Sequence, residues 1–395
     1  MANTVLTHQM IAREAAAILE EEAPFLANIN KGRKEEFGAD NQGYKKGGEV
    51  TIKVPTAGKV FDGAEFAEGG NATDFKEDKV TLSLDTQKHV ALEFGAKEKL
   101  LDITDFRERI LRPQIQTLSS VVEADLLQRA YKATSNTVAL GTGYEGLVDA
   151  RNKLNQFLTP TGQRSAIVSG KANKKISTEV AKLFNPTQTS DKAYLQGFVG
   201  KSAGFDIFEH QSTPVHTANG TAATITTAGA NQSGDVIKLK AGTAGTLLKG
   251  TIFTIAGIYA VHPLTGLTTG DLQQFVVRAD TTVATTATDV PIYPAISASQ
   301  PGQTVTALAA DGVVATVVSV AGNQNLAFHK DAFTAAFAPL GVLAGCEGYT
   351  ARMPNGMSIR VMTFGDGKSD SEGTRIDVLY GFAAVRGNHA VRITE

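Results

Sequence analysis

Residues 48–94 read GEVTIKVPTAGKVFDGAEFAEGGNATDFKEDKVTLSLDTQKHVALEF, and their pattern governs the expected architecture. Two runs, around Ile52 and from Val80 to Phe94, alternate apolar and polar residues as half-buried strands do. The residues between the runs are polar and rich in glycine, so they have little to bury in a core of their own. Connections of that length are uncommon in compact domains and are usually functional or disordered. We therefore expect a hairpin that projects toward a neighbouring molecule, which favours an assembly protein over an enzyme.

A long helix is predicted behind this hairpin, over residues 113–132. It has proline at its first position, where the missing N–H costs nothing. Further helices are predicted over 7–22, 144–158 and 172–184, with a short buried strand at 166–168. Strands and helices mix without a regular alternation, which favours the α+β class. The stripe of the long helix consists of Ile115, Leu118, Val121, Val122, Leu126 and Ala130.

Composition changes abruptly near Thr217 and changes back near Ala321. Only nine charged residues lie between Ala218 and Val320, although the chain has 38 basic and 40 acidic residues. Short extended runs separated by turn residues fill this segment, a pattern typical of a small β-barrel or sandwich. We interpret it as an inserted domain.

The chain after the insert returns to the mixed pattern. We predict a short helix over 332–337, because a proline follows at position 339. Strands are predicted over 358–364 and 375–382, and Gly365-Asp366-Gly367 between them is a hairpin signal. A last edge strand is expected over 390–393.

Overall charge and cysteine usage exclude several classes of protein. The formal net charge is −2, so no global basic field indicates nucleic-acid binding. Cys346 is the only cysteine, which excludes an intramolecular disulfide or a multi-cysteine zinc site. We expect no secretory signal, since acidic residues interrupt the first apolar stretch, and no transmembrane helix, since the longest apolar run (251–261) is too short.

Motifs for catalysis and cofactor binding are missing or incomplete. Ser165 stands where a P-loop needs glycine, and His210 and His216 lack the spacing of a zinc pair. Cys346 lies in a small-residue stretch that suits a buried thiol better than a catalytic one. Four lysines lie within the predicted helix 172–184 or just before it. We interpret them as a solvated face, and the alternative is a site for an acidic partner or internal nucleic acid. They are Lys171, Lys174, Lys175 and Lys182.

Several segments, taken in order, resemble one known family, the P22-like major capsid (coat) proteins of tailed bacteriophages, which share the HK97 capsid fold. The most specific segment is Arg375-Ile376-Asp377-Val378-Leu379-Tyr380-Gly381, followed by His389-Ala390-Val391-Arg392-Ile393. Lys249 to Gly257 resembles a segment of that family's inserted domain. The other matching segments are Met10 to Ala15, Glu36-Phe37-Gly38, Gly48 to Ile52, Gln87 to Val90, Phe94 and Phe106 to Asp125.

The resemblance implies a division of the chain into five parts. Residues 1–44 would be an N-terminal arm, and 45–95 the E-loop with flanking P-domain strands. Residues 96–217 would hold the spine helix of the P-domain and part of the A-domain. Residues 218–320 would be the inserted β-domain, and 321–395 the rest of the A-domain with the closing P-domain strands.

The resemblance also implies which residues meet neighbouring subunits, and it implies no catalytic, cofactor-binding or metal-binding residue. In the N-terminal arm, the interface residues would be Ile11, Ile18 and Leu19. Lysines near the E-loop tip are ordinary for an exposed loop, so no covalent cross-link is predicted. The expected E-loop interface residues are Lys59, Phe61, Glu65, Phe66, Glu68, Phe75 and Lys76.

The resulting hypothesis is a non-enzymatic major capsid protein that self-assembles into an icosahedral shell. Its expected partners are other copies of itself in hexamers and pentamers, a scaffolding protein, a portal, and loosely contacted double-stranded DNA, with no membrane and no cofactor. It would be made in the host cytoplasm and reside in the virion. The main alternative is an encapsulin-like compartment, against which the insert argues; a surface β-protein and an undetected enzyme are further alternatives.

Overall fold

The computed structural model describes residues 8–21, 23–31, 49–54, 78–95, 112–182, 200–217, 223–353, 356–366 and 371–395. The chain divides into two compact units, each assembled from segments that are distant in sequence. Unit 1 consists of Met1–Ile52, Val80–Leu127 and Phe333–Val385. Unit 2 consists of Lys53–Lys79, Gln128–Ala332 and Arg386–Glu395.

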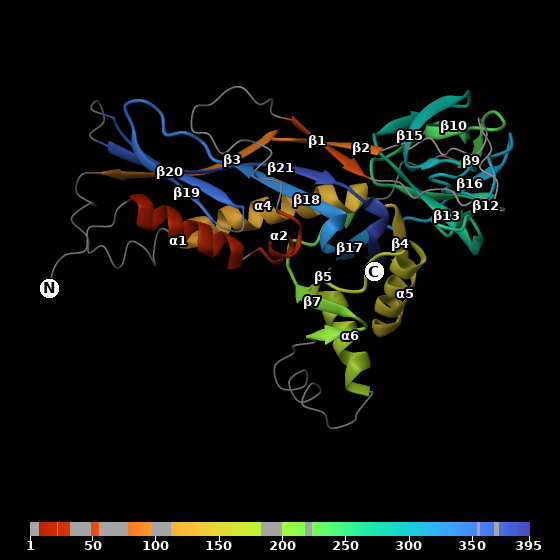
Figure 1. Ribbon diagram of the computed structural model, residues 1–395, viewed down its shortest axis with the longest axis horizontal. Coiled ribbons are helices and arrows are strands. Elements are labelled where there is room, and N and C mark those ends of the chain that lie inside the picture. Colours follow the sequence, from red (N-terminus) through yellow and green to blue (C-terminus); the bar gives the residue numbers. More distant parts are fainter. Residues whose placement is uncertain are drawn as a thin grey trace, which may run out of the picture. The chain divides into compact units, whose positions relative to one another are not determined.

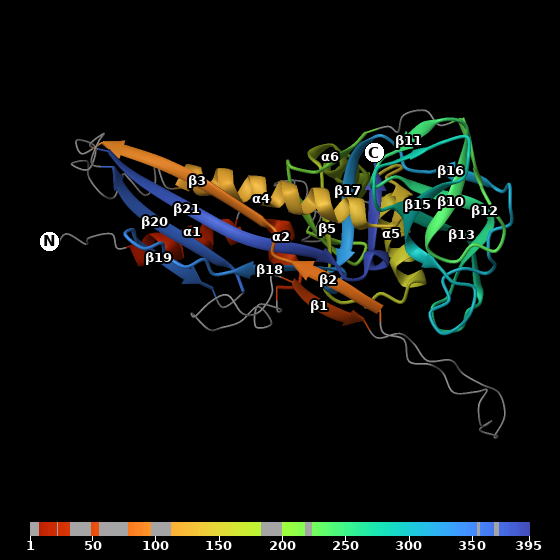
Figure 2. The same cartoon turned by 90° about the horizontal axis from the view of Figure 1, so that it is seen from above.

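Unit 1 is built on an antiparallel five-stranded sheet with a long strand, β21 (Ser371–Ala384), in the middle. β3 pairs with β21 from Thr86↔Tyr380 to Gly95↔Ser371, and Figure 2 shows the two strands side by side. The rest of the sheet consists of β18 (Phe333–Ala338), β20 (Ser358–Asp366) and β19 (Glu347–Arg352), with β3 spanning Thr86–Gly95.

Helices of unit 1 bury one face each. α1 (His8–Glu21) packs on β19 and β20 and is followed by the short helix α2 (Pro24–Asn28). α4 (Arg112–Ala133) contributes residues 112–127 to this unit. Its apolar stripe recurs every three or four residues, which places the stripe on one face. The stripe residues that are buried in unit 1 are Ile115, Leu118, Val122 and Leu126.

A two-stranded sheet brackets the expected E-loop. β1 (Glu49–Val54) pairs with β2 (Asp78–Ser83), and Ile52 and Leu82 on these strands are buried with Ala336. The predicted extended run from Val80 to Phe94 is therefore two strands. The chain leaves β2 near Ser83 and enters β3, which joins a different sheet.

Unit 2 contains a mixed sheet with the order β4-β22-β17-β5-β7-β6, and β8 pairs with β17. β4–β22 and β5–β7 are parallel, whereas β17 is antiparallel to both of its neighbours. α5 (Tyr144–Gln156) packs on β4 and β22, and α6 (Gly170–Lys182) contacts α5 (Figure 1). The strands are β4 (Asn136–Ala139), β5 (Arg164–Val168), β6 (Lys201–Ser202), β7 (Phe205–Glu209), β8 (Val215–His216), β17 (Gly322–His329) and β22 (Ala390–Thr394).

The remainder of unit 2 is a closed barrel of six strands inside the predicted insert. Closure leaves no long exposed edge, and the interior is filled by apolar side chains such as Phe253 and Phe275, whose rings lie 5.8 Å apart. β11 (Gly245–Leu247) and β14 (Thr281–Val283) form a separate two-stranded antiparallel sheet. In barrel order the strands are β10 (Gly234–Thr243), β15 (Thr288–Ile296), β13 (Thr268–Val277), β12 (Ile252–Val261), β16 (Val314–Val317) and β9 (Ala223–Thr227).

Two sequence predictions in the last part of the chain are wrong. The segment 332–337 is not a helix: a 3-10 turn at Lys330–Ala332 leads into β18, of which Phe333 to Phe337 are buried. A strand buried on both faces loses the two-residue alternation that would identify it. The 390–393 strand is not an edge, because β22 lies between β4 and β17.

The α+β class and the inserted barrel agree with the sequence prediction, whereas the exact domain bounds remain a prediction. Within the described part of the chain, none of the helices is both long enough and apolar enough to cross a membrane.

Candidate functional site: arm segments and the barrel junction

The expected E-loop interface residues lie outside the described residues. β1 ends at Val54 and β2 begins at Asp78, so the paired strands hold the two ends of this segment together. Their part in contacts between subunits remains a prediction. It concerns Lys59, Phe61, Glu65, Phe66, Glu68, Phe75 and Lys76.

The expected N-arm residues are described, and they pack within unit 1. Leu19 has no exposed surface and Ile18 is 6% exposed, while Ile11 is half-buried. α1 presents this face to β19 and β20 of the same chain. A neighbouring subunit could reach Ile18 or Leu19 only if α1 left that position, so their interface role also remains a prediction.

A buried carboxylate anchors the N-terminal segment to α4. The two oxygens of Glu123 accept the backbone N–H groups of Phe25 at 2.6 Å and Leu26 at 3.2 Å, at the start of α2. Helix starts leave N–H groups without partners, and an acidic group satisfies them well. Burial raises the pKa of Glu123 to about 7, against the lowering effect of the two backbone hydrogen bonds.

Asn30 then ties the end of this segment to β18. Its N–H donates to the carbonyl of Phe333 at 3.3 Å, and its own carbonyl accepts from the N–H of Ala335 at 3.0 Å. Beside it, the Phe25 ring lies 5.8 Å from that of Phe333. Residues 23–31 are therefore fixed on both sides, by α4 and by the sheet.

The sheet of unit 1 contains a fully buried carboxylate that is paired by two arginines. Arg360 Nη2 lies 2.7 Å from Asp377 Oδ2, and Arg375 Nε lies 2.7 Å from Asp377 Oδ1. Arg360 also donates to the carbonyl of Gly341. Removing one partner of such a buried pair is strongly destabilising, because the other charge is left uncompensated.

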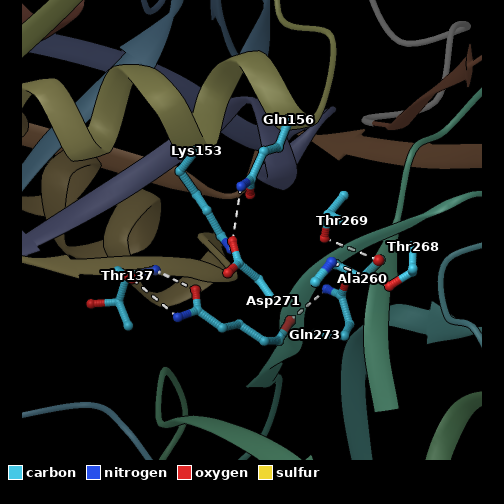
Figure 3. A network of polar contacts seen from close by, with 10 residues as sticks. Thr137, Lys153, Gln156, Ala260, Thr268, Thr269, Asp271 and Gln273 are labelled. Carbon is cyan, nitrogen blue, oxygen red and sulfur yellow. Dashed lines mark hydrogen bonds and ion pairs between the residues drawn. The ribbon is translucent and has the colours of Figure 1, made fainter.

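In unit 2, the barrel contacts the mixed sheet through polar groups. Lys153 and Gln156 of α5 converge on Asp271 of β13, with Nζ–Oδ2 and Nε2–Oδ2 distances of 3.4 and 2.8 Å (Figure 3). The hydrogen bond from Gln156 lowers the pKa of Asp271, helped by the smaller effect of the Lys153 charge and opposed by partial burial. Beside this cluster, Gln274 bonds the backbone of Thr137 on β4.

A buried arginine completes this contact, which we call the barrel junction: Lys153, Gln156 and Asp271, the pair Thr137–Gln274, and Arg392. The guanidinium of Arg392 donates from Nη1 to the carbonyl of Gly250 at 2.7 Å and from Nη2 to that of Thr134 at 2.8 Å. It also lies 5.2 Å from the centroid of the Tyr131 ring. Burial lowers the pKa of Arg392 to about 9, so it stays protonated at neutral pH.

Gly250 is required where Arg392 binds. Its φ is +95°, a conformation that residues with a Cβ rarely adopt, and a Cβ there would lie 3.0 Å from Lys132 Cγ and 3.2 Å from Lys132 Cα. The absence of a side chain lets the carbonyl of Gly250 approach the end of α4 and face the guanidinium.

Three histidines of unit 2 are buried and neutral. The His216 ring packs edge-on against Tyr131 at 6.0 Å, and the rings of His329 and His389 lie 6.5 Å apart. Burial, reinforced by nearby cationic groups, lowers the pKa of His216 and of His389 to about 4. These rings serve as packing groups at pH 7, and protonating them inside the fold is unfavourable.

Candidates for chemistry are scarce in the part of the chain that the structure describes. No cluster of three or more His, Cys, Asp or Glu side chains there could hold a metal ion. Cys346 is half-buried. Lys171, Lys174 and Lys175 are exposed on α6 and show no common partner, which agrees with a solvated face.

Sequence reasoning missed most of these anchoring residues, because the contacts of Glu123 and of the barrel junction join positions about a hundred or more residues apart. A charged residue within an apolar strand is the one signal that could have identified Arg392. For Glu123, Gln274 and Asp271 the sequence carries no distinct local signal.

Comparison with known protein families decides the relationship. The model of the P22 coat protein family, described as gene protein 5, matches residues 33–393. The chain belongs to the P22 coat protein family. The resemblance noted in the sequence is thereby confirmed, and the chain is a capsid protein of the phage type, a shell-forming subunit. The encapsulin-like alternative is less favoured.

Solved structures similar to this P22-family chain are distant in sequence. A Mycobacterium phage Che8 structure is 13% identical, with 94% of this chain and 90% of that chain covered and a TM-score of 0.46. The capsid of cyanophage P-SCSP1u is 10% identical over 89% and 84%, with a TM-score of 0.45. A virus-like particle from Pyrococcus furiosus is 7% identical over 97% of both chains, with a TM-score of 0.41. No curated protein matches the chain.

Proposed function

We propose that this coat protein forms an icosahedral shell of hexamers and pentamers around double-stranded DNA, and that the mechanism is physical rather than catalytic. The observation that carries the proposal is the family match over residues 33–393. Many contacts of modest area become strong when they are repeated around a closed assembly.

The two arm segments are the parts that we assign to contacts between neighbours. The E-loop assignment is supported by the pairing of β1 with β2, the strands that precede and follow residues 55–77 in the chain. For the N-terminal segment, anchored by Glu123 in its own subunit, we propose that only its outer surface meets a neighbour while α1 stays in place.

Further partners follow from the requirements of a closed shell. The same chain must occupy both hexamers and pentamers, so we propose an assembly scaffold that sets curvature and a portal at one vertex. The exposed lysines of α6 are suited to loose contact with packaged DNA, because such contact needs only positive charge. Synthesis would take place in the host cytoplasm, and no catalytic step is proposed.

Electron microscopy of the purified chain tests the proposal directly. We expect closed shells or ring-shaped capsomers in negative stain, with matching masses by light scattering. Deleting residues 58–74 should leave a folded, soluble subunit that no longer assembles. Normal assembly by the deleted chain would rule out the E-loop assignment.

A chain in which residues 58–74 are shuffled is the matched control, since it keeps length and composition. If only the native order supports shells, the contacts are specific. If the shuffled chain assembles equally well, the segment acts only as a spacer, and the assignment of particular interface residues fails. Shells that enclose protein cargo rather than DNA in the native host would favour the compartment alternative.

A further inference from the structure

β4 is the terminal strand of the mixed sheet in unit 2, and its outer side has no strand partner among the described residues. It pairs in parallel with β22, and the N–H of Leu140, just after β4, donates to the carbonyl of Thr394 on β22. Successive residues of a strand direct their backbone groups to opposite edges. The N–H and C=O of Thr137 therefore point away from β22, where an additional strand would otherwise bind.

One side chain of the barrel occupies this position. Gln274 Oε1 accepts the N–H of Thr137 at 2.8 Å, and Gln274 Nε2 donates to the C=O of Thr137 at 3.1 Å. A primary amide carries the same donor and acceptor as a peptide group. Gln274 thus makes with Thr137 the two hydrogen bonds that one residue of an added strand would make.

The rest of the barrel junction holds the amide in place. Asp271, three residues before Gln274 on β13, is bonded by Lys153 and Gln156 of α5. The backbone of Gln274 itself is fixed by the pairing of β13 with the neighbouring strand β12, in register Thr254↔Gln274. The amide therefore approaches β4 from a rigid barrel that is also anchored at Gly250 by Arg392.

The chain uses the same arrangement a second time, within the barrel. Gln232 Oε1 accepts the N–H of Lys238 at 2.5 Å, and Gln232 Nε2 donates to the C=O of Lys238 at 3.2 Å. The pairing of β10 with β9 covers Leu239 to Thr243 and so ends just before Lys238. There, however, the carbonyl of Lys238 also accepts the backbone N–H of Ala228 at 2.9 Å, so the amide of Gln232 adds to strand pairing, whereas that of Gln274 takes the place of a missing strand.

We propose that Gln274 closes the open edge of β4 and thereby prevents an extended segment of a second copy of this chain from adding there as a strand. Uncovered edges are templates for strand addition, and folded proteins cover them in several ways. A second copy is the partner we assign, because a chain synthesised in many copies meets its own extended segments at the highest concentration. The inference goes beyond shell formation and holds whether or not shells form.

The test compares Gln274→Ala with Gln232→Ala in the full chain. The first removes two amide–backbone hydrogen bonds, and the second removes four, two of them to Lys238. Hydrogen exchange with mass spectrometry reports on the peptide spanning 134–140, and light scattering after size exclusion reports on association. For Gln274→Ala we expect exchange at Thr137 at least tenfold faster than in the parent chain, together with concentration-dependent oligomers that are not shells. For Gln232→Ala we expect neither change.

A double variant, Gln274→Ala with Thr137→Pro, identifies the edge. Proline cannot donate to an added strand, and at position 137 the missing N–H faces away from β22. The extra association should disappear in this variant. Oligomers that persist despite the proline, or unchanged exchange over 134–140 in Gln274→Ala, would overturn the proposal.

Should Gln274→Ala fail to fold, Gln274→Glu provides the second variant. A carboxylate can still accept from Thr137 N–H but cannot donate to its carbonyl. We expect the N–H to stay protected and association to be weaker than in Gln274→Ala; full association with a protected N–H would contradict the edge mechanism. Electron microscopy of the same samples separates shells from edge-mediated oligomers, so failure of shell formation is read independently.

Discussion

Glu123 in unit 1 and Arg392 in unit 2 are opposite solutions to the same problem. Each side chain is fully buried, each carries a charge in water, and neither forms an ion pair among the described residues. Glu123 accepts two backbone N–H groups at the start of α2, whereas Arg392 donates to two backbone carbonyls, one of them just beyond the end of α4. Helix ends supply the complementary partial charges in both cases.

The difference lies in how each group responds to protons. Burial brings the pKa of Glu123 to about 7, within the physiological range, but leaves that of Arg392 at about 9. The N-terminal segment is therefore held by a group whose charge depends on pH, and the barrel by one whose charge is constant below pH 8. One anchor can therefore be adjusted by pH and the other cannot.

Replacing Arg392 should have the largest effect. Arg392→Ala leaves the carbonyls of Gly250 and Thr134 buried without donors and opens a cavity beside Tyr131. We expect a loss of about 4 kcal/mol in the free energy of unfolding. Urea unfolding followed by circular dichroism measures it. Arg392→Lys keeps the charge but not the forked geometry, so it should recover only part of the loss; full recovery would show that charge alone matters.

The pH response of Glu123 gives the next effect. A pKa raised from 4.5 to about 7 in the folded state stabilises unit 1 below pH 4.5, and this stability is lost as pH rises through 7. The change amounts to about 3 kcal/mol. Glu123→Gln does not titrate, so its stability relative to the parent chain should improve by that amount between pH 4 and pH 8. A constant difference between the two proteins would show that Glu123 titrates normally.

The buried histidines should give unit 2 the opposite trend. With the pKa of His216 and His389 lowered from 6.5 to about 4, their contribution is present above pH 6.5 and is lost as pH falls toward 4. Over that range we expect about 3 kcal/mol for each histidine. His389 also faces Arg386, His329, Asp331 and Arg164, so His216→Phe is the cleaner variant.

Hydrogen exchange at pH 7 and pH 5, corrected for the intrinsic rate, measures both units in one sample. Peptides from 112–127 should become more protected at the lower pH and peptides from 386–394 less protected. His216→Phe should weaken the second trend without changing the first. Parallel trends in the two units would contradict the assignment of the two anchors.

The smallest effect is expected at the rim of the barrel junction. Asp271 is half-exposed, and its contact with Lys153 spans 3.4 Å, so solvent screens most of the attraction. Asp271→Asn should cost less than about 1 kcal/mol and should be insensitive to salt above physiological ionic strength. Thermal unfolding of the two proteins at low and high salt provides the measurement. A larger loss would mean that the contacts of Asp271, and not those of Arg392, provide most of the stability of the junction.

Elements with a clear spacing of apolar residues or a clear change in composition were predictable from the sequence. Elements with neither were not. The stripe from Ile115 to Ala130 identified α4, and the scarcity of charge after Ala218 identified the barrel segment. By contrast, Phe333 to Phe337 are buried on both faces of a strand, and their sequence is equally compatible with a short helix. The order of strands around β22 depends on pairing with residues more than two hundred positions away, which no local pattern encodes.

The anchoring residues were unpredictable for a related reason. Glu123 lies in a helix with one other acidic residue, Asp125, and only the folded position of Phe25, 98 residues earlier, distinguishes it. Likewise, Gln274 is one of two neighbouring glutamines on β13. Only the position of β4 in the folded chain shows which of the two binds Thr137. The interface residues predicted from the family resemblance are a separate case, since most of them lie outside the described residues.

The pairing of β8 with β17 has a practical consequence. His216 lies opposite Gly322 and Val215 opposite Asn323, so the chain leaves the mixed sheet and returns to it at adjacent positions. The two ends of the insert are thus held next to each other by strand pairing in the mixed sheet. A foreign domain whose termini lie close together could be inserted there without distorting this sheet. Such a replacement would also have to supply a carbonyl for Arg392 and an amide for Thr137. These two contacts are therefore the requirements that any domain placed at this position must meet.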